Sequence, residues 1–127
     1  KEFYTPSKKA IFNVPYIVHN TSIQPDAEFP LILTTGRVRD QWHTMTKTGK
    51  VSRLKTHYSK PVLEINPVDA YIAGVKDGDV VEIKSPKGLV RLRANVTENI
   101  RKGVVFLPMH WGKQLQSDLN RANNLTV

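Results

Sequence analysis

The sequence predicts a mainly β domain, closed into a barrel, with one or two short helices. Two observations support this fold class. Short apolar or alternating segments, about six or seven of them, are separated by turns rich in Gly, Pro and Asn. Only one stretch carries clear helix signals at both of its ends. The length of 127 residues suits a single domain, residues 1–127, with one core.

The first half of the chain predicts two strands and a long basic loop. Residues 4–9 are typical of a turn that leads into a short strand at Ala10–Phe12. Residues 25–28 form a connector, and the apolar run that follows predicts a buried strand over 29–36. Residues 45–60 carry five basic side chains, no acid and no clear period, which predicts a long loop with at most one helical turn.

Helix signals follow the next strand, which we predict at Pro61–Ile65. Asn66 can cap a helix, and Pro67 suits its first position. Gly74 can end it. We expect this helix to bury its apolar residues, which are Val68, Tyr71, Ile72 and Val75.

Three more strands are predicted in the second half. The first covers Val80–Lys84, with Val81 and Ile83 on one face. A turn over 85–88 leads to residues 90–96, where apolar and basic side chains alternate, as in a half-buried strand. Val104–Leu107 is apolar throughout and predicts a buried strand. The polar tail from Lys113 leaves room for one short helix.

The composition limits the kind of partner. The net charge of +8, from 19 basic and 11 acidic residues, attracts polyanions such as nucleic acid, an anionic membrane or a phosphorylated ligand. The alternatives are a basic face that only keeps the domain in solution, or one that meets an acidic partner. No apolar stretch is long enough for a membrane span, and no signal-peptide pattern opens the chain. The first residue, Lys1, indicates a processed chain or an excised fragment.

Cysteine is absent, which excludes disulfides, iron–sulfur ligation and thiolate metal binding within these residues. This agrees with a cytoplasmic origin. The four histidines show no zinc-type spacing, and neither a nucleophile motif nor a phosphate-binding glycine loop is present. We therefore predict no catalytic residue and no metal ligand in this chain.

The segment Thr35–Thr44 stands out as a candidate binding loop. It combines threonines, one glycine and two arginines with adjacent Trp42 and His43. Hydroxyls, backbone N–H groups around Gly36 and guanidinium forks suit phosphate oxygens, while the two rings offer flat faces. This combination predicts a nucleotide-like ligand. The alternative is a polar loop after a strand, with Trp42 packed in the core.

A second strand end carries similar residues, because His110 and Trp111 follow the predicted strand Val104–Leu107. If both strand ends meet at one edge of the barrel, their aromatic rings, histidines and basic groups form one site.

Five motifs in order resemble a known family. They are Leu-Thr-Thr-Gly-Arg-x-x-x-Gln-Trp-His-Thr from Leu33, Ile-x-Pro-x-Asp-Ala, Asp-Gly-Asp-x-Val-x-Ile, Gly-Val-Val-Phe-x-Pro-x-His-Trp and Asn-x-Leu-Thr. Together they resemble the C-terminal molybdopterin-dinucleotide-binding domain of the dimethyl sulfoxide reductase family of molybdenum oxidoreductases. The segment Gln41–Thr44, continued by residues 45–50, is most similar to assimilatory nitrate reductases. Formate dehydrogenases share much of the pattern.

The resemblance implies a six-stranded double-psi β-barrel. It implies that this barrel encloses bis(molybdopterin guanine dinucleotide) with molybdenum, within a cytoplasmic enzyme that reduces nitrate to nitrite. The molybdenum ligand and a [4Fe-4S] cluster would lie in earlier domains, and the electron donor would be ferredoxin, flavodoxin or an NADH-linked subunit. The fragment alone is expected to be a non-catalytic monomer that binds no nucleic acid. A formate dehydrogenase and a basic β-barrel that binds nucleic acid stay open as alternatives.

The resemblance also implies which residues contact the cofactor. Arg37 would grip pyrophosphate, Trp42 and His43 would wall the pterin, and Asp40 would either accept from a guanine edge or cap the loop. The full set is Thr35, Gly36, Arg37, Val38, Arg39, Asp40, Gln41, Trp42, His43, Thr44, Trp111 and Asn123.

Overall fold

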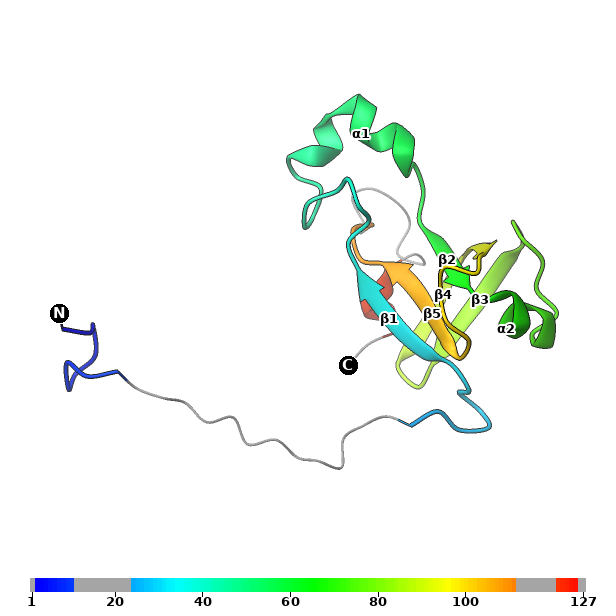
Figure 1. The fold of residues 1–127 in the computed structure, drawn as a ribbon, viewed down its shortest axis with the longest axis horizontal. Coiled ribbons are helices and arrows are strands. Elements are labelled where there is room, and N and C mark those ends of the chain that lie inside the picture. The colour runs from blue at the N-terminus through cyan, green and yellow to red at the C-terminus, as the bar shows by residue number, and fades with distance from the viewer. Residues whose placement is uncertain (1, 11–23, 112–120, 126–127) are drawn as a thin grey trace.

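A computed structural model describes residues 2–10, 24–111 and 121–125. These residues form one mixed five-stranded sheet in the order β1-β5-β2-β4-β3 (Figure 1). The strands are β1 (Ile32–Gly36), β2 (Val62–Ile65), β3 (Val80–Ser85), β4 (Gly88–Val96) and β5 (Val104–Pro108). Two short α-helices, α1 (Ser52–His57) and α2 (Pro67–Ile72), and two 3-10 turns, η2 (Thr48–Lys50) and η4 (Ala122–Asn124), complete the described elements. The mainly β prediction is confirmed.

Strand directions decide which loops meet. β1 runs parallel to β5, with Gly36 opposite Pro108, so both strands finish at the same end of the sheet. β2 runs antiparallel to β5 and parallel to β4, so both β2 and β4 begin near that end. We call the segments 35–44 and 109–111 at this end of the sheet the rim. The predicted meeting of the two strand ends is thereby confirmed.

The core lies on one face of the sheet. Alternation places every second residue of β4 on that face, so Val90, Leu92 and Ala94 are buried while Arg91 and Arg93 are exposed. Residues from β2, β5, α2 and η4 join them, namely Leu63, Ile65, Ala70, Val105, Leu107, Ala122 and Leu125. The strands predicted at 61–65, 80–84, 90–96 and 104–107 are all confirmed, apart from shifts of a residue or a few at their ends.

Two expectations about these segments need correction. The strand predicted over 29–36 is not buried, because β5 is the one strand beside β1 among the described residues, and Ile32 is 41% exposed. The loop predicted over 45–60 contains η2 and α1. The described residues hold five strands, and the predicted number of six or seven stays a prediction. Residues 11–23 and 112–120, which include Ile11 and Phe12 of the predicted strand Ala10–Phe12 and most of the tail, lie outside the description.

The helix prediction is right in position and wrong in orientation. Asn66 caps α2 through a side-chain bond from Val68 N–H (3.0 Å), and Gly74 follows it with φ +68°. However, Val68, Tyr71 and Ile72 are exposed, whereas Asp69 and Ala70 are buried. Asp69 points inward because its carboxylate accepts from Gly103 N–H at 2.6 Å. No helix in the described part of the chain is long and apolar enough to cross a membrane.

The C-terminal turn η4 packs on the hairpin that joins β3 to β4. Ser85 Oγ donates to the Leu125 carbonyl at 2.8 Å. Gly88 approaches so closely that a Cβ there would lie 2.3 Å from the Asn124 carbonyl oxygen. Because β4 begins near the rim edge, this contact brings Asn123 to the same end of the sheet as the rim.

We predict that Gly88→Ala displaces η4, because the new Cβ would collide with the Asn124 backbone. Overpacking of this kind costs about 1–3 kcal/mol of the free energy of unfolding. Urea unfolding followed by tryptophan fluorescence measures the loss. Lys87→Ala, an exposed neighbour in the same hairpin, is the control and should leave the midpoint unchanged. Equal midpoints for both variants would contradict this packing.

Candidate functional site

A single histidine joins the two halves of the rim. His110 is buried, and its Nε2 accepts a hydrogen bond from Val38 N–H at 3.0 Å. Its Nδ1 contacts the His43 carbonyl oxygen and therefore carries the proton in this arrangement. Met109 N–H also donates to the Gly36 carbonyl at 3.0 Å, which extends the β1–β5 pairing. The loop after β1 is thus fastened to the loop after β5 at both of its ends.

A second set of bonds fastens the rim to α1. Trp42 N–H donates to Thr48 Oγ1 (3.0 Å), and the Thr48 hydroxyl donates to Gln41 Oε1 (2.7 Å). Gln41 Nε2 in turn donates to the Leu54 carbonyl in α1 at 3.4 Å. The side chain of Gln41 is only 2% exposed, so its contacts are made inside the loop.

The backbone has one left-handed residue other than glycine in the rim, His43, and another directly after it, Met45. His43 has φ +38° and Met45 has φ +62°, a region that costs non-glycine residues about 1–3 kcal/mol. Contacts on both residues hold this conformation. His110 binds the His43 carbonyl, and Met45 is buried in a small cluster with Val38 and Trp111, against which Tyr58 packs.

Both carboxylate oxygens of Asp40 make hydrogen bonds with neighbouring side chains. Arg39 donates to Oδ1 and Oδ2, each at 3.0 Å, and His57 Nδ1 is 2.8 Å from Oδ2. The Arg39 hydrogen bonds, followed by that of His57, hold the pKa of the Asp40 carboxyl below its ordinary value. Since His57 is the last residue of α1, this contact is another link between α1 and the rim.

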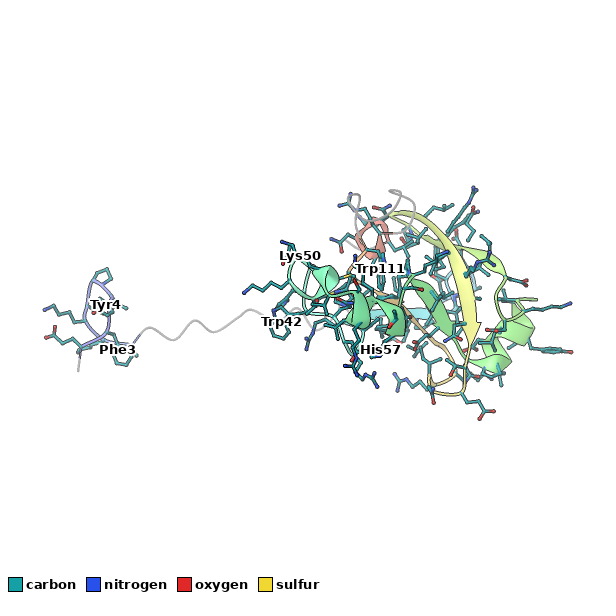
Figure 2. All side chains as sticks on the ribbon, turned by 90° about the horizontal axis from the view of Figure 1, so that it is seen from above. Phe3, Tyr4, Trp42, Lys50, His57 and Trp111 are labelled. Atoms are coloured by element: carbon teal, nitrogen blue, oxygen red, sulfur yellow. The ribbon has the colours of Figure 1, made fainter. Side chains whose placement is uncertain are left out.

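The outer surface of the rim presents a cation on aromatic rings. The Arg37 guanidinium lies 4.6 Å from the centre of the Trp42 ring, and the His43 ring meets Trp42 edge-on at 4.3 Å. Trp42 is 53% exposed and lies at the surface, while Trp111 lies inside the body (Figure 2). Rings that are exposed in this way can stack on a planar group of a ligand.

The structure brings the predicted site residues to one end of the sheet but distributes them between surface and interior. Those with exposed side chains are Thr35, Arg37, Arg39, Trp42, His43, Thr44 and Asn123. Val38, Gln41 and Trp111 are buried beneath them, and Gly36 and Asp40 are intermediate. Gly36 has no left-handed φ, and it is tightly packed because a Cβ would lie 3.3 Å from the Phe106 ring.

Charge reinforces this surface. Residues 37–60 hold seven basic side chains and one acid, Asp40. Within the described ranges, Asp40 is ion-paired with Arg39 and in contact with His57, whereas no acid contacts Arg37. A guanidinium without a carboxylate partner, on an exposed ring and beside exposed hydroxyls, fits an anionic ligand that also carries a planar group.

Tyr58 adds a polar group that the sequence did not indicate. Its ring packs against Trp111 with centroids 5.7 Å apart, and its buried hydroxyl has no hydrogen-bond partner in the described part of the chain. Burial, with a smaller contribution from Glu64, raises the pKa of Tyr58 to about 12. A buried donor of this kind just beneath the rim can serve a ligand atom that reaches it.

Sequence reasoning also missed the supporting residues of the site. His110 was expected at the rim but not as its central link, and Met45, Thr48 and His57 lay in a segment predicted to be a loop. No local signal identifies them, because each acts through a partner at least six residues away. Among the described residues, no group of three or more His, Asp or Glu side chains could hold a metal ion.

Comparison with known proteins supplies the family. Residues 31–127 match the family model described as "Molydopterin dinucleotide binding domain". The chain is 43% identical to a nitrate reductase of Klebsiella oxytoca, over 88% of this chain and 13% of that protein. It is 34% identical to the assimilatory nitrate reductase catalytic subunit of Bacillus subtilis, over 98% of this chain and 17% of that protein.

The alpha subunit of a formate dehydrogenase from Methanocaldococcus jannaschii is also similar, with 41% identity over 80% of this chain and 15% of the relative. The chain therefore spans only 13 to 17% of the length of these three relatives. Acetylene hydratase from Pelobacter acetylenicus shares the fold, with a TM-score of 0.66 at 18% identity over 77% of this chain and 15% of that one.

We predict that His110→Ala loosens the rim. It leaves the Val38 N–H buried without an acceptor, which costs about 1–3 kcal/mol, and it frees the left-handed turn at His43. Amide hydrogen exchange at Val38 and Met45 should accelerate by roughly tenfold or more. Met109→Ala, an exposed neighbour whose side chain makes no such link, is the control. Unchanged exchange at both amides in His110→Ala would contradict the bridge.

Tyr58 gives a prediction about alkaline pH. The pKa of Tyr58 is raised to about 12 in the folded chain, against about 10 in an unfolded chain. The stabilisation of the fold by the neutral Tyr58 side chain is therefore complete below about pH 10. That contribution is lost as the pH rises towards 12. An ultraviolet absorbance titration of the four tyrosines should show one ionisation at a higher pH than the others, and Tyr58→Phe should abolish that ionisation. If Tyr58→Phe abolished an ionisation near pH 10 instead, the assignment of the raised pKa to Tyr58 would be refuted.

Proposed function

The chain belongs to the Molydopterin dinucleotide binding domain family, and we propose that it binds and encloses bis(molybdopterin guanine dinucleotide) with molybdenum as one domain of a larger oxidoreductase. The observation that carries the proposal is the rim. It places the Arg37 guanidinium, which has no carboxylate partner among the described residues, over the exposed Trp42 ring, beside exposed threonines. The family supplies the ligand, and this surface has the charge and the flat faces that such a ligand requires.

The exposed rim residues take direct roles. Arg37 provides a fork for pyrophosphate oxygens, and the hydroxyls of Thr35 and Thr44 provide donors. Trp42 and His43 stack on or beside a planar ring system. Asn123, held at the same end of the sheet by η4, offers an amide to the ligand.

The buried rim residues keep this surface in shape. Val38, Gln41 and Trp111 lie beneath it, and Arg39 and Asp40 pair with each other. Tyr58 adds a buried hydroxyl beside Trp111 that can donate to a polar atom of the ligand. When bound, the cofactor supplies the redox chemistry, and this chain's residues position it and tune its electrostatic surroundings.

The complete enzyme in this proposal reduces nitrate to nitrite. Support comes from nitrate reductases among the relatives, such as the assimilatory one of Bacillus subtilis. The formate dehydrogenase relative keeps formate oxidation as the second candidate activity. A [4Fe-4S] cluster, an electron donor such as ferredoxin, flavodoxin or an NADH-linked subunit, a cytoplasmic location and closure into a six-stranded double-psi barrel stay predictions from the resemblance. The nucleic-acid alternative gains no support from the family match.

Arg37→Ala in the complete enzyme should lower cofactor occupancy. A charged hydrogen bond contributes on the order of 1.5–3 kcal/mol, so the binding equilibrium should weaken roughly ten- to a hundredfold. Molybdenum content per protein, with turnover on the same samples, measures the effect. Arg37→Lys should recover only part of the loss, because lysine cannot grip two oxygens through one planar fork.

The control is Arg91→Ala, since Arg91 pairs with Glu82 on the exposed face of β4 and lies outside the rim. It should leave the molybdenum content unchanged. Full molybdenum loading and normal turnover in Arg37→Ala would contradict the role proposed for Arg37. Cofactor loss in Arg91→Ala would show that the cofactor binds on a different face.

Nitrate and formate can be separated by one assay on the complete, molybdenum-loaded enzyme. We expect reduced viologen to be oxidised when nitrate is added. We expect no reduction of viologen by formate. Formate oxidation without nitrate reduction would replace the first candidate activity with the second.

A further inference from the structure

Helix α2 carries its apolar side chains on the outside. Val68, Tyr71 and Ile72 are 47%, 87% and 72% exposed. They stand at positions i, i+3 and i+4, so they form one stripe along the helix. We call these three residues the α2 stripe. Single exposed apolar residues are ordinary on protein surfaces, but a contiguous stripe that includes a tyrosine is typical of a contact surface.

The inward side of the helix is fixed by polar bonds, so the exposed stripe does not result from a loosely placed helix. Asp69 is 6% exposed and accepts from Gly103 N–H at 2.6 Å. Asn66 caps the helix and donates through Nδ2 to the Ile100 carbonyl at 2.8 Å. Ala70, at 2% exposure, fills the space against the core. Rotating the helix to bury the stripe would break these bonds.

The α2 stripe is separate from the rim. The rim lies at the edge where β2 begins, whereas α2 follows the end of β2 and so lies at the opposite end of the sheet. Figure 1 shows α2 on a different side of the molecule from α1, which is linked to the rim. A ligand held on the rim therefore leaves the stripe uncovered.

We infer that an apolar surface of another domain of the same polypeptide covers the α2 stripe. The inference rests on the proposal above that this chain is one domain of a larger enzyme. Its relatives support such an occupant, since the chain spans 13 to 17% of their lengths and most of their residues lie outside the region matched here. The stripe then anchors the cofactor-binding domain to its neighbour from the side away from the cofactor.

The size of the stripe favours this occupant over a second copy of the chain. An aromatic side chain buries about 150–250 Å², so one tyrosine with two smaller aliphatic side chains falls well short of the roughly 800 Å² per partner that a stable dimer buries. A domain joined by a covalent linker meets its neighbour at a high effective concentration, so a smaller patch is sufficient.

The test uses the double variant Tyr71→Ser/Ile72→Ser in the complete enzyme, with limited proteolysis as the readout. We expect this domain to be released by the protease roughly tenfold faster than from the wild-type enzyme. The same two substitutions in the 127-residue chain should leave its urea midpoint unchanged, because both side chains are exposed there. Val51→Ser is the matched control, since Val51 is an exposed apolar residue next to α1, away from α2.

The outcomes are distinguishable. Unchanged release from the complete double variant would overturn the inference, as would an equal loss of stability in the 127-residue chain. A wild-type chain that forms dimers by analytical ultracentrifugation, and a double variant that does not, would assign the stripe to a second copy and also overturn it. Faster release from a complete protein that never contains molybdenum would leave the inference standing while the proposed function fails.

Discussion

The rim depends on one buried imidazole. His110, in the loop after β5, accepts from Val38 N–H and contacts the His43 carbonyl, so it holds the loop after β1 at two points that lie 72 and 67 residues away from it in sequence. The parallel pairing of β1 with β5 places the two strand ends together, and the imidazole fixes how the loops leave them. The left-handed turn at His43 is held by this attachment, and the Arg37–Trp42 pair lies between the two points at which the loop is held.

Much of this arrangement could be predicted from the sequence, because the informative signals are local. Alternation in residues 90–96, the cap at Asn66 and the glycine after α2 each act within a few residues, and each was placed correctly. The two strand ends that carry Trp and His beside basic groups also lie together, as the sequence pattern suggested. The sequence did not indicate which of these residues are exposed and which are buried. Gln41 and Trp111 have the same residue types as ligand contacts, yet they lie in the interior, and only the long-range partners of each decide this.

The errors have a common physical origin, which is that burial depends on what lies beside an element. The apolar run before Thr34 reads as an interior strand, yet β1 has a neighbour on one side only among the described strands. The stripe of α2 reads as a core face, yet Asp69 and Asn66 hold the helix with that face outward. Both errors show that an apolar pattern alone does not decide burial, because the polar bonds of Asp69 and Asn66 and the position of β1 in the sheet decide which side chains are covered.

We expect the rim to be assembled before the cofactor binds, and hydrogen exchange on the complete enzyme, with and without cofactor, is the most direct test. Exchange at Val38 and Met45 should be slow in both forms, because these amides are bonded within the protein. Added protection at Arg37 and Thr44 is expected only when the cofactor is present. Fast exchange at Val38 and Met45 in the cofactor-free enzyme would show that the ligand builds the rim. Identical exchange at Arg37 and Thr44 in the two forms would place the cofactor elsewhere.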